Sequence, residues 1–237
     1  MKAVEVPTVI CQSGSRRISL GAATETRSGE WRPSVMIGTK MMNDDELMGS
    51  DPHGERASKA YHLLSIDASQ SLAELKALAN RGSAMGMLYL GYAYGEKLGA
   101  NIDYAEAVRW YKSAYDKGSF TALISLGMIY FDKIIDHGES ERLFFEGASN
   151  GDGQSMYWLG RIYLLDASNK TKLDRVRTLW EDAAARGQVL AKYGLGLLFV
   201  KGRYGLKNIP KGFWLCATAL ANSFKIALCD ATDRRLR

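Results

Sequence analysis

The chain has 237 residues, of which 46% are hydrophobic and 24% charged, and its formal net charge is +5 with a pI of about 9.0. This length suffices for one sizeable core or a short array of repeats. The mild positive charge is typical of an ordinary soluble protein, and no Lys/Arg cluster is interleaved with aromatic residues as a nucleic-acid groove requires. Nucleic acid is therefore excluded as a predicted partner.

Cysteine usage and hydropathy predict a cytoplasmic protein. Cys11, Cys216 and Cys229 are widely separated and form no CxxC pair, so the sequence supports neither a disulfide framework nor a zinc site. The opening MKAVEVPTVICQSGSRR is not a secretory signal, because Glu5 and Pro7 interrupt its apolar stretch. No segment has the roughly 20 consecutive apolar residues of a membrane span.

The first part of the chain differs in composition from the rest. Residues 1–50 are rich in Ser, Thr, Gly and charge, and we expect a mostly disordered polar leader with a short extended stretch at Val4–Ile10. From Asp51–Pro52 onward the sequence becomes helical, and the segment SLAELKALANRG is a short amphipathic helix closed by Gly82. Residues 51–82 are predicted to form N-terminal capping helices or a degenerate half-repeat.

A recurring Leu-Gly dipeptide marks the following segment. It occurs at intervals of 36, 33 and 36 residues, at Leu90–Gly91, Leu126–Gly127, Leu159–Gly160 and Leu195–Gly196. Three residues after each of these glycines stands an aromatic residue: Tyr94, Tyr130, Tyr163 and Phe199. Four residues before each leucine stands a small residue: Gly86, Ala122, Ser155 and Ala191. Eight residues before each leucine stands a glycine that can end a helix: Gly82, Gly118, Gly151 and Gly187.

Each repeat also contains a second predicted helix. Its central bulky residues are Trp110, Leu143, Leu179 and Leu215. Three residues earlier stand Ala107, Ser140, Val176 and Gly212, and four residues later stand Ala114, Gly147, Ala183 and Ala219. Asp103, Asp136 and Asn208 occupy the expected N-cap position, and Ser223 replaces the closing glycine in the last repeat. Four repeats are therefore predicted over residues 83–223, followed by a basic C-terminal tail over residues 224–237.

The pattern has a physical reason. A glycine beside the leucine lets the paired helix approach closely, because no Cβ intervenes, and small residues on the second helix act in the same way. A single hairpin cannot bury its apolar face, so neighbouring hairpins must stack. The predicted fold is an all-α solenoid of antiparallel helix hairpins.

The combined pattern A-x-x-x-L-G-x-x-Y, then D-x-x-x-A-x-x-W-x-x-x-A-A-x-x-G, resembles the Sel1-like repeat, a relative of the tetratricopeptide repeat. The resemblance covers roughly residues 70 to 223 and is best in the first repeat, where Leu90, Gly91, Asp103 and Trp110 fall in family positions. It implies a right-handed superhelical array that serves as an adaptor or scaffold. The predicted function is thus a protein–protein interaction scaffold that binds a partner protein or peptide through the concave surface. The alternatives are an immunity or inhibitor-type protein that blocks one enzyme or toxin, and an enzyme or small-ligand sensor with an unrecognised site.

No catalytic set emerges from the sequence. His53, His62 and His137 form no pair at i, i+4 that could ligate a metal. No P-loop, GxSxG or dinucleotide-binding motif is present, so we predict no cofactor, no metal and no enzymatic activity.

The predicted partner site lies on the first helix of each repeat, on the side away from its hairpin mate. Tyr, Trp and Arg dominate the hot spots of protein interfaces. The predicted groove residues are Tyr89, Tyr92, Met128, Trp158, Arg161 and Tyr193. The alternative is that adjacent repeats cover them, with Trp158 buried and Arg161 laid across it. Trp110, Trp180 and Trp214 are predicted to serve packing instead.

Overall fold

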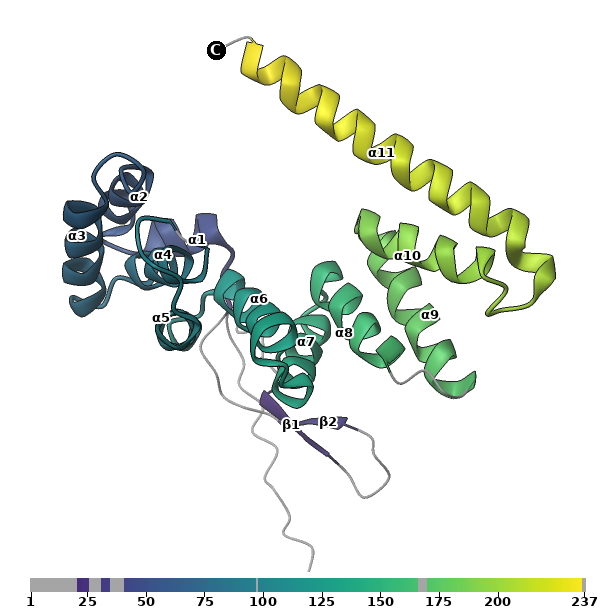
Figure 1. Cartoon of the computed structure of the whole chain (residues 1–237). Coiled ribbons are helices and arrows are strands. Elements are labelled where there is room, and N and C mark those ends of the chain that lie inside the picture. Colours follow the sequence, from purple (N-terminus) through teal and green to yellow (C-terminus); the bar gives the residue numbers. More distant parts are fainter. Residues whose placement is uncertain (1–20, 26–30, 35–40, 97, 166–169, 236–237) are drawn as a thin grey trace, which may run out of the picture.

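The computed structural model describes residues 21–25, 31–34, 41–96, 98–165 and 170–235, with the backbone alone described for the first two ranges and from residue 223 onward. The chain forms an array of helix pairs, with a two-stranded hairpin beside it (Figure 1). The pairs in chain order are α2 (Gly54–His62) with α3 (Ala68–Asn80), α4 (Ala84–Gly95) with α5 (Tyr104–Asp116), α6 (Phe120–Ile129) with α7 (His137–Ser149), α8 (Gly153–Leu165) with α9 (Lys170–Ala185), and α10 (Val189–Val200) with α11 (Ile209–Arg235). The all-α solenoid of helix hairpins is confirmed.

The closing glycines set the junction between one pair and the next. Gly118 has a φ of 91°, a left-handed conformation that ends α5 and that other residues adopt only with strain. Ser119 follows as the N-cap of α6, and its hydroxyl accepts a hydrogen bond from the Ala122 amide at 3.2 Å. The other three closing glycines, Gly82, Gly151 and Gly187, also have positive φ.

Each Leu-Gly glycine is the point where the two helices of a pair meet. A Cβ on Gly127 would lie 2.7 Å from the Phe144 ring, and one on Gly91 would overlap the Tyr111 ring. In the third pair Trp180 lies on Gly160, and in the last Cys216 lies on Gly196. The close approach predicted from the sequence is therefore present. The side chain that fills the space comes from the residue directly after the predicted bulky position.

Residues 51–82, predicted as capping helices or a degenerate half-repeat, are helical. They form a complete helix pair, in which Asp67 caps α3 as Asp103 caps α5. The Asp51 carboxylate joins this pair to the next one by accepting hydrogen bonds from the Ser83 hydroxyl at 2.7 Å and the Met85 amide at 2.9 Å.

The last ten residues of the predicted disordered leader are also structured. Helix α1 (Asp44–Ser50) buries Leu47, which is 1% exposed. Met42 pairs with the α5–α6 junction, where its amide donates to the Gly118 carbonyl at 2.7 Å and its carbonyl accepts from the Phe120 amide at 3.0 Å. The Leu47 side chain and the extended Met42 backbone both make their contacts with the stacked repeats. These contacts therefore exist only once the repeats are stacked.

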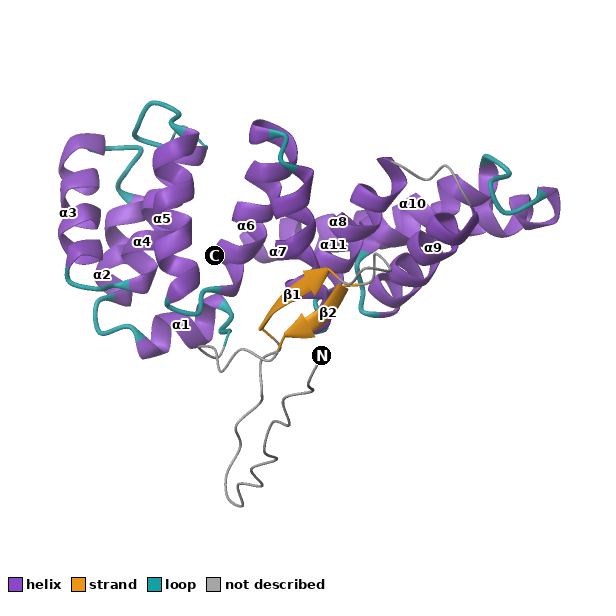
Figure 2. Ribbon diagram, turned by 90° about the horizontal axis from the view of Figure 1, so that it is seen from below, coloured by secondary structure: helices purple, strands orange, loops and turns teal. Residues whose placement is uncertain are grey.

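Two strands precede this segment. β1 (Gly21–Glu25) pairs antiparallel with β2 (Trp31–Ser34), with Glu25 opposite Trp31, and β1 lies beside α7 (Figures 1 and 2). The predicted extended stretch Val4–Ile10 lies outside the described residues.

The C-terminal end also differs from the prediction. Where the other second helices stop at a closing glycine, α11 continues past Ser223 to Arg235, so the backbone of the predicted tail is helical to that residue. Ser223 does not readily take the left-handed conformation that reverses the chain. Trp214, predicted as a packing residue, is 63% exposed, whereas Trp110 and Trp180 are buried as expected.

These contacts predict different outcomes for two truncations. The free energy of unfolding of a chain that begins at residue 51 should be about 1–2 kcal/mol lower than that of a chain that begins at residue 41. The reason is that the burial of Leu47 outweighs the entropic cost of ordering α1. Urea unfolding of the two truncated proteins measures this difference. Equal midpoints and slopes would mean that α1 and Met42 contribute nothing to the fold.

Candidate interaction face on the first helices

Successive pairs contact one another through their first helices or the turns that follow them. The Tyr92 phenol of α4 hydrogen-bonds Ser125 of α6, and Phe131, which follows α6, packs against Trp158 of α8. The second helices make their own contacts, as where the Tyr115 hydroxyl of α5 donates to the Glu146 carboxylate of α7 at 2.9 Å. We use the name first-helix face for the surface formed by the residues one before and two after each Leu-Gly leucine, which are Tyr89, Tyr92, Ser125, Met128, Trp158, Arg161, Gly194 and Leu197.

A group of four tyrosines lies at the N-terminal part of this face. Tyr89 of α4 stacks on Tyr61 of α2, with ring centres 4.4 Å apart and planes inclined by 15°. Tyr92 lies 6.5 Å from Tyr89 and meets the edge of Tyr111 at 5.7 Å. Such offset and edge contacts between aromatic rings are favourable. Tyr89 and Tyr92, two of the predicted groove residues, thus lie close together, and both are half-buried.

The Tyr92 phenol is held protonated. Burial raises its pKa well above the ordinary value, and the nearby carboxylates of Asp44 and Glu96 raise it further, while the hydrogen bond with Ser125 acts in the opposite direction. Tyr92 therefore stays a neutral hydrogen-bonding group at every physiological pH.

Met128 lies beside this group, at a small cavity between α5, α6 and η1 (the π-helical turn Tyr130–Ile134). The cavity has a volume of about 140 Å³. Its apolar walls include Tyr104, Tyr111 and Met128, and Glu96, Asp132 and Lys133 stand around it. A cavity of this kind fits an aliphatic stem that ends in a polar or charged group.

Trp158 is a correction to the sequence prediction. It is 9% exposed and is enclosed by the Phe144 ring, stacked at 5.8 Å with planes inclined by 10°, and by the edge of Phe131 at 5.4 Å. It belongs to the packing between the second and third repeats, because its position one before the leucine faces α7 and the turn η1 of the preceding repeat. The alternative considered from the sequence, burial between repeats, is the correct one.

Arg161 covers this aromatic group from outside. Its guanidinium carbon lies 4.6 Å from the centre of the Trp158 ring and 5.1 Å from that of Phe131. These are cation–π distances, so the two rings attract the guanidinium and restrict its position. Over the ranges where side chains are described, no carboxylate forms an ion pair with Arg161. Its N–H donors are therefore available to a ligand.

Tyr193 lies apart from the other predicted residues. It is on α10, is 36% exposed, and has no ring stacked on it among the described side chains. The predicted residues thus fall into three places: the tyrosine group with Met128, the Trp158–Arg161 stack, and Tyr193. Sequence reasoning missed Tyr61, Tyr111 and Phe131. The recurrence of Tyr111, Phe144 and Trp180 at one repeat position could have identified Tyr111, whereas Tyr61 lies before the recognisable repeats.

Charge changes sign along the array at the outer end of the first helices. Six residues after each leucine stand Glu96, Asp132, Leu165 and Lys201, all exposed. Asp44 adds a carboxylate at the N-terminal part, where it accepts a hydrogen bond from the Thr121 hydroxyl at 2.6 Å, and Arg161 adds a cation further along. The surroundings of the first-helix face thus carry carboxylates at the N-terminal part of the array and cations at the C-terminal part.

Two further properties of the described residues bear on function. No three His, Cys, Asp or Glu side chains gather in the described part of the chain as a possible metal site. No helix within that part is both long and apolar enough to cross a membrane.

Comparison with known proteins identifies similar repeats. No profile of a known protein family matches the chain. A sel1-like repeat-containing protein of Acanthamoeba polyphaga mimivirus is 29% identical over 116 residues, which are 48% of this chain and 21% of the viral protein. This chain therefore spans about a fifth of the length of that relative.

Two crystal structures have the same fold. One is a protective antigen of uropathogenic Escherichia coli that displays an SLR fold, with a TM-score of 0.53 and 24% identity over 65% of this chain and 34% of the antigen. The other is a Sel1 repeat protein from Oxalobacter formigenes, with a TM-score of 0.53 and 24% identity over 63% of this chain and 61% of that protein. The helix pairs of this chain thus have the fold of Sel1-like repeats, in agreement with the resemblance seen in the sequence.

Proposed function

We propose that this chain, which belongs to the Sel1-like repeat family, is an interaction scaffold that binds a segment of a partner protein on its first-helix face. The observation that carries the proposal is the Arg161 guanidinium, which lies against the Trp158 and Phe131 rings with no carboxylate partner among the described residues. A guanidinium held in this way loses little conformational freedom when it binds a carboxylate. The partner segment therefore carries an acidic side chain or a terminal carboxylate at this point.

The tyrosine group supplies the apolar part of the proposed interface. Tyr89 and Tyr92 are rigid and half-buried, and Met128 beside them adapts its shape to a ligand. The two carboxylates of Glu96 and Asp132 outnumber the Lys133 ammonium at the neighbouring cavity and favour a basic side chain of the partner, whose aliphatic stem would lie against Met128. Opposite charges at the two parts of the face would give the bound segment one direction along the array.

The test begins with the partner itself. The tagged full chain is used to capture proteins from cell extract, mass spectrometry identifies them, and overlapping peptides of a captured protein locate the bound segment. We expect Arg161→Ala to weaken that segment's binding by roughly 10- to 30-fold, as for the loss of an interface hot spot. Its thermal unfolding should match that of the parent protein within about two degrees, since Trp158 keeps its contacts with Phe131 and Phe144.

The matched control is Lys112→Ala, which removes an exposed cation from the second helix α5. It should bind the segment as the parent does. Equal binding by the parent, Arg161→Ala and Lys112→Ala would contradict the proposed site. An inhibitor-type role is a special case of the same binding, and it would be recognised if the captured partner were an enzyme that loses activity in the complex. The cytoplasmic location stays a prediction.

A further inference from the structure

A hollow opens in the third repeat among α7, α8 and α9. Its volume is about 590 Å³, within the range of roughly 300–1,000 Å³ that is usual for small-ligand sites. One wall is a single face of α9, since its residues follow the helical spacing i, i+3, i+4, i+7 and i+8: Thr171, Asp174, Arg175, Thr178 and Leu179. The other walls are formed by Leu159 and Tyr163 of α8 and Phe145 of α7. We call this hollow the α9 groove.

The α9 groove has a polar end and an apolar end, about 12 Å apart along α9. Because α8 and α9 form an antiparallel pair, Tyr163 near the end of α8 lies beside the first turns of α9. Burial raises the pKa of the Tyr163 phenol well above its ordinary value, and Arg175 acts in the opposite direction, so its guanidinium lies near that hydroxyl. Leu159 lies one turn before Tyr163, and with Leu179 and the Phe145 ring it forms the apolar end.

Ion pairs cover the corresponding place in the second repeat. There Glu139 and Arg142 stand at the repeat positions of Arg175 and Thr178, and their side chains form an ion pair at 2.8 Å. Arg142 also lies 3.7 Å from the carboxylate of Glu146, which accepts a hydrogen bond from α5. The side chains of α7 are thus linked to the preceding second helix across this place.

A large ring occupies the corresponding place in the first repeat. Trp110 stands at the repeat position of Leu179 and is buried, and the guanidinium carbon of Arg109 lies 4.3 Å from the centre of its ring. Arg109 also forms an ion pair with Glu106 at 2.7 Å. The third repeat has the smaller Leu179 and the uncharged Thr178 at these positions. The α9 groove is therefore open because the third repeat lacks both the ring and the ion pair.

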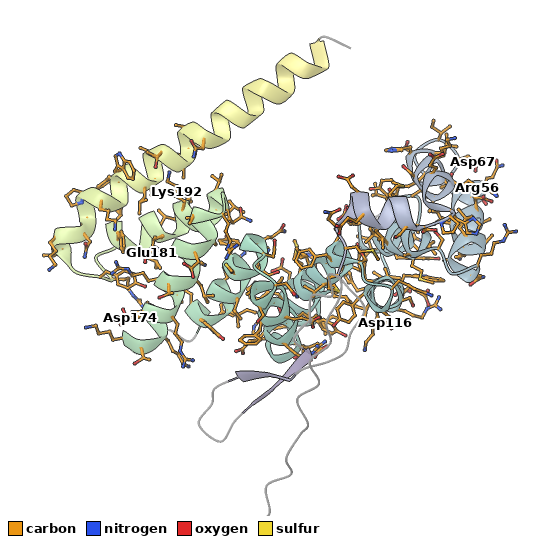
Figure 3. The ribbon with its side chains drawn as sticks, turned by 180° about the vertical axis from the view of Figure 1, so that it is seen from behind. Arg56, Asp67, Asp116, Asp174, Glu181 and Lys192 are labelled. Carbon is orange, nitrogen blue, oxygen red and sulfur yellow. The ribbon has the colours of Figure 1, made fainter. Side chains whose placement is uncertain are left out.

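The polar end of the α9 groove carries two opposite charges. Among the side chains that the structure describes, neither Asp174 nor Arg175 forms an ion pair, and both are exposed. Arg177 on the same helix, by contrast, pairs with Glu181 at 3.0 Å. Figure 3 shows Asp174 towards the N-terminal end of α9 and Glu181 nearer its C-terminal end. A carboxylate and a guanidinium thus stand side by side at the polar end, both available to a ligand.

We propose that the α9 groove binds a free α-amino acid with a large apolar side chain. Arg175 binds the carboxylate of the ligand, with the Thr171 hydroxyl as a further donor, and Asp174 binds its ammonium group. The apolar side chain of the ligand lies at the other end, against Phe145 and Leu179. A ligand with a carboxylate alone would face the negative charge of Asp174, and one with an ammonium alone would face the guanidinium. The two adjacent charges therefore favour a ligand that carries both. This proposal does not rest on the first-helix face.

The test compares four small molecules: L-phenylalanine, N-acetyl-L-phenylalanine, L-phenylalanine amide and L-serine. Each is titrated into the full chain at a mildly acidic pH that keeps the free amines protonated, and chemical-shift changes in NMR spectra report binding. We expect a dissociation constant on the order of 1 mM for phenylalanine, as for other ligands of about 12 non-hydrogen atoms. The acetyl derivative lacks the ammonium, the amide lacks the carboxylate and serine lacks the apolar group. Each of these three should therefore bind more weakly by about fivefold or more.

Two variants locate the binding. Arg175→Glu combined with Thr178→Arg copies the Glu139–Arg142 ion pair of the second repeat into the third and should close the groove. Binding of phenylalanine should then be lost without a lower melting temperature, because both replaced side chains are exposed. Asp174→Asn removes only the group that binds the ammonium, so phenylalanine and its acetyl derivative should bind this variant equally.

Lys112→Ala, which removes an exposed cation of α5 outside the groove, is the control and should bind phenylalanine as the parent does. Several results would overturn the proposal. One is a parent chain that does not bind phenylalanine, and another is undiminished binding by the Arg175→Glu, Thr178→Arg variant. Binding of the acetyl derivative as tightly as phenylalanine by the parent would assign the groove to the C-terminus of a peptide instead. Equal binding of all four molecules would show that the two charges select nothing.

Discussion

Replacement of Trp158 by alanine is expected to lower the free energy of unfolding by about 3–5 kcal/mol, the usual cost of removing a large buried aromatic side chain. The indole lies between Phe131 and Phe144, and its loss leaves a cavity at the junction of the second and third repeats. The guanidinium of Arg161 would also lose the ring on which it rests. Urea unfolding followed by circular dichroism measures the change.

Trp214 provides the matched control, because it is the same residue type on a second helix of the same array but is 63% exposed. Trp214→Ala should change the stability by less than about 0.5 kcal/mol. If the two variants unfolded at the same urea concentration, the burial assigned to Trp158 would be wrong. Comparing the stabilities of the two variants also separates the effect of removing any indole from the effect of removing one that is packed in the core.

The second large effect is expected for Gly127→Leu, which should destabilise the protein by about 3 kcal/mol, at the upper end of the usual cost of overpacking. Even a Cβ at this position would lie 2.7 Å from the Phe144 ring. That ring cannot move aside, because it is fully buried and stacked on Trp158. The Ser140 hydroxyl, which donates to the Gly127 carbonyl at 2.9 Å, further fixes the two helices at this distance.

Gly138→Ala is the control for this second prediction. Gly138 is on the first turn of α7, and within 4 Å of a Cβ there the only contact is the Asp136 carboxylate at 3.5 Å. The substitution should be neutral or stabilise the protein by about 0.5–1 kcal/mol, because alanine restricts the unfolded chain more than glycine does. A melting temperature of Gly127→Leu equal to that of Gly138→Ala would contradict the close helix contact at the Leu-Gly dipeptide.

The sequence by itself determined the repeat register, because the features that set it act locally. A closing glycine such as Gly118 turns the chain through its own φ, and a cap such as Asp103 bonds amides two and three residues away. The dipeptide Leu126–Gly127 pairs with the helix that follows directly in the chain. Such contacts repeat with the sequence, so their period could be found without coordinates.

Only the tertiary structure decided which of the aromatic side chains are exposed. Trp158 was predicted to face a ligand and is buried, because the Phe131 and Phe144 rings of the preceding repeat lie against it. Trp214 was predicted to be buried and is exposed, and Leu47 was placed in a disordered leader although it is buried. The burial of Trp158 and Leu47 depends on elements that lie elsewhere in the chain, and Trp214 stands at the repeat position of Arg109 and Thr178, which are exposed as well. Local sequence patterns do not encode contacts between distant elements, since these contacts are set by how the helix pairs stack.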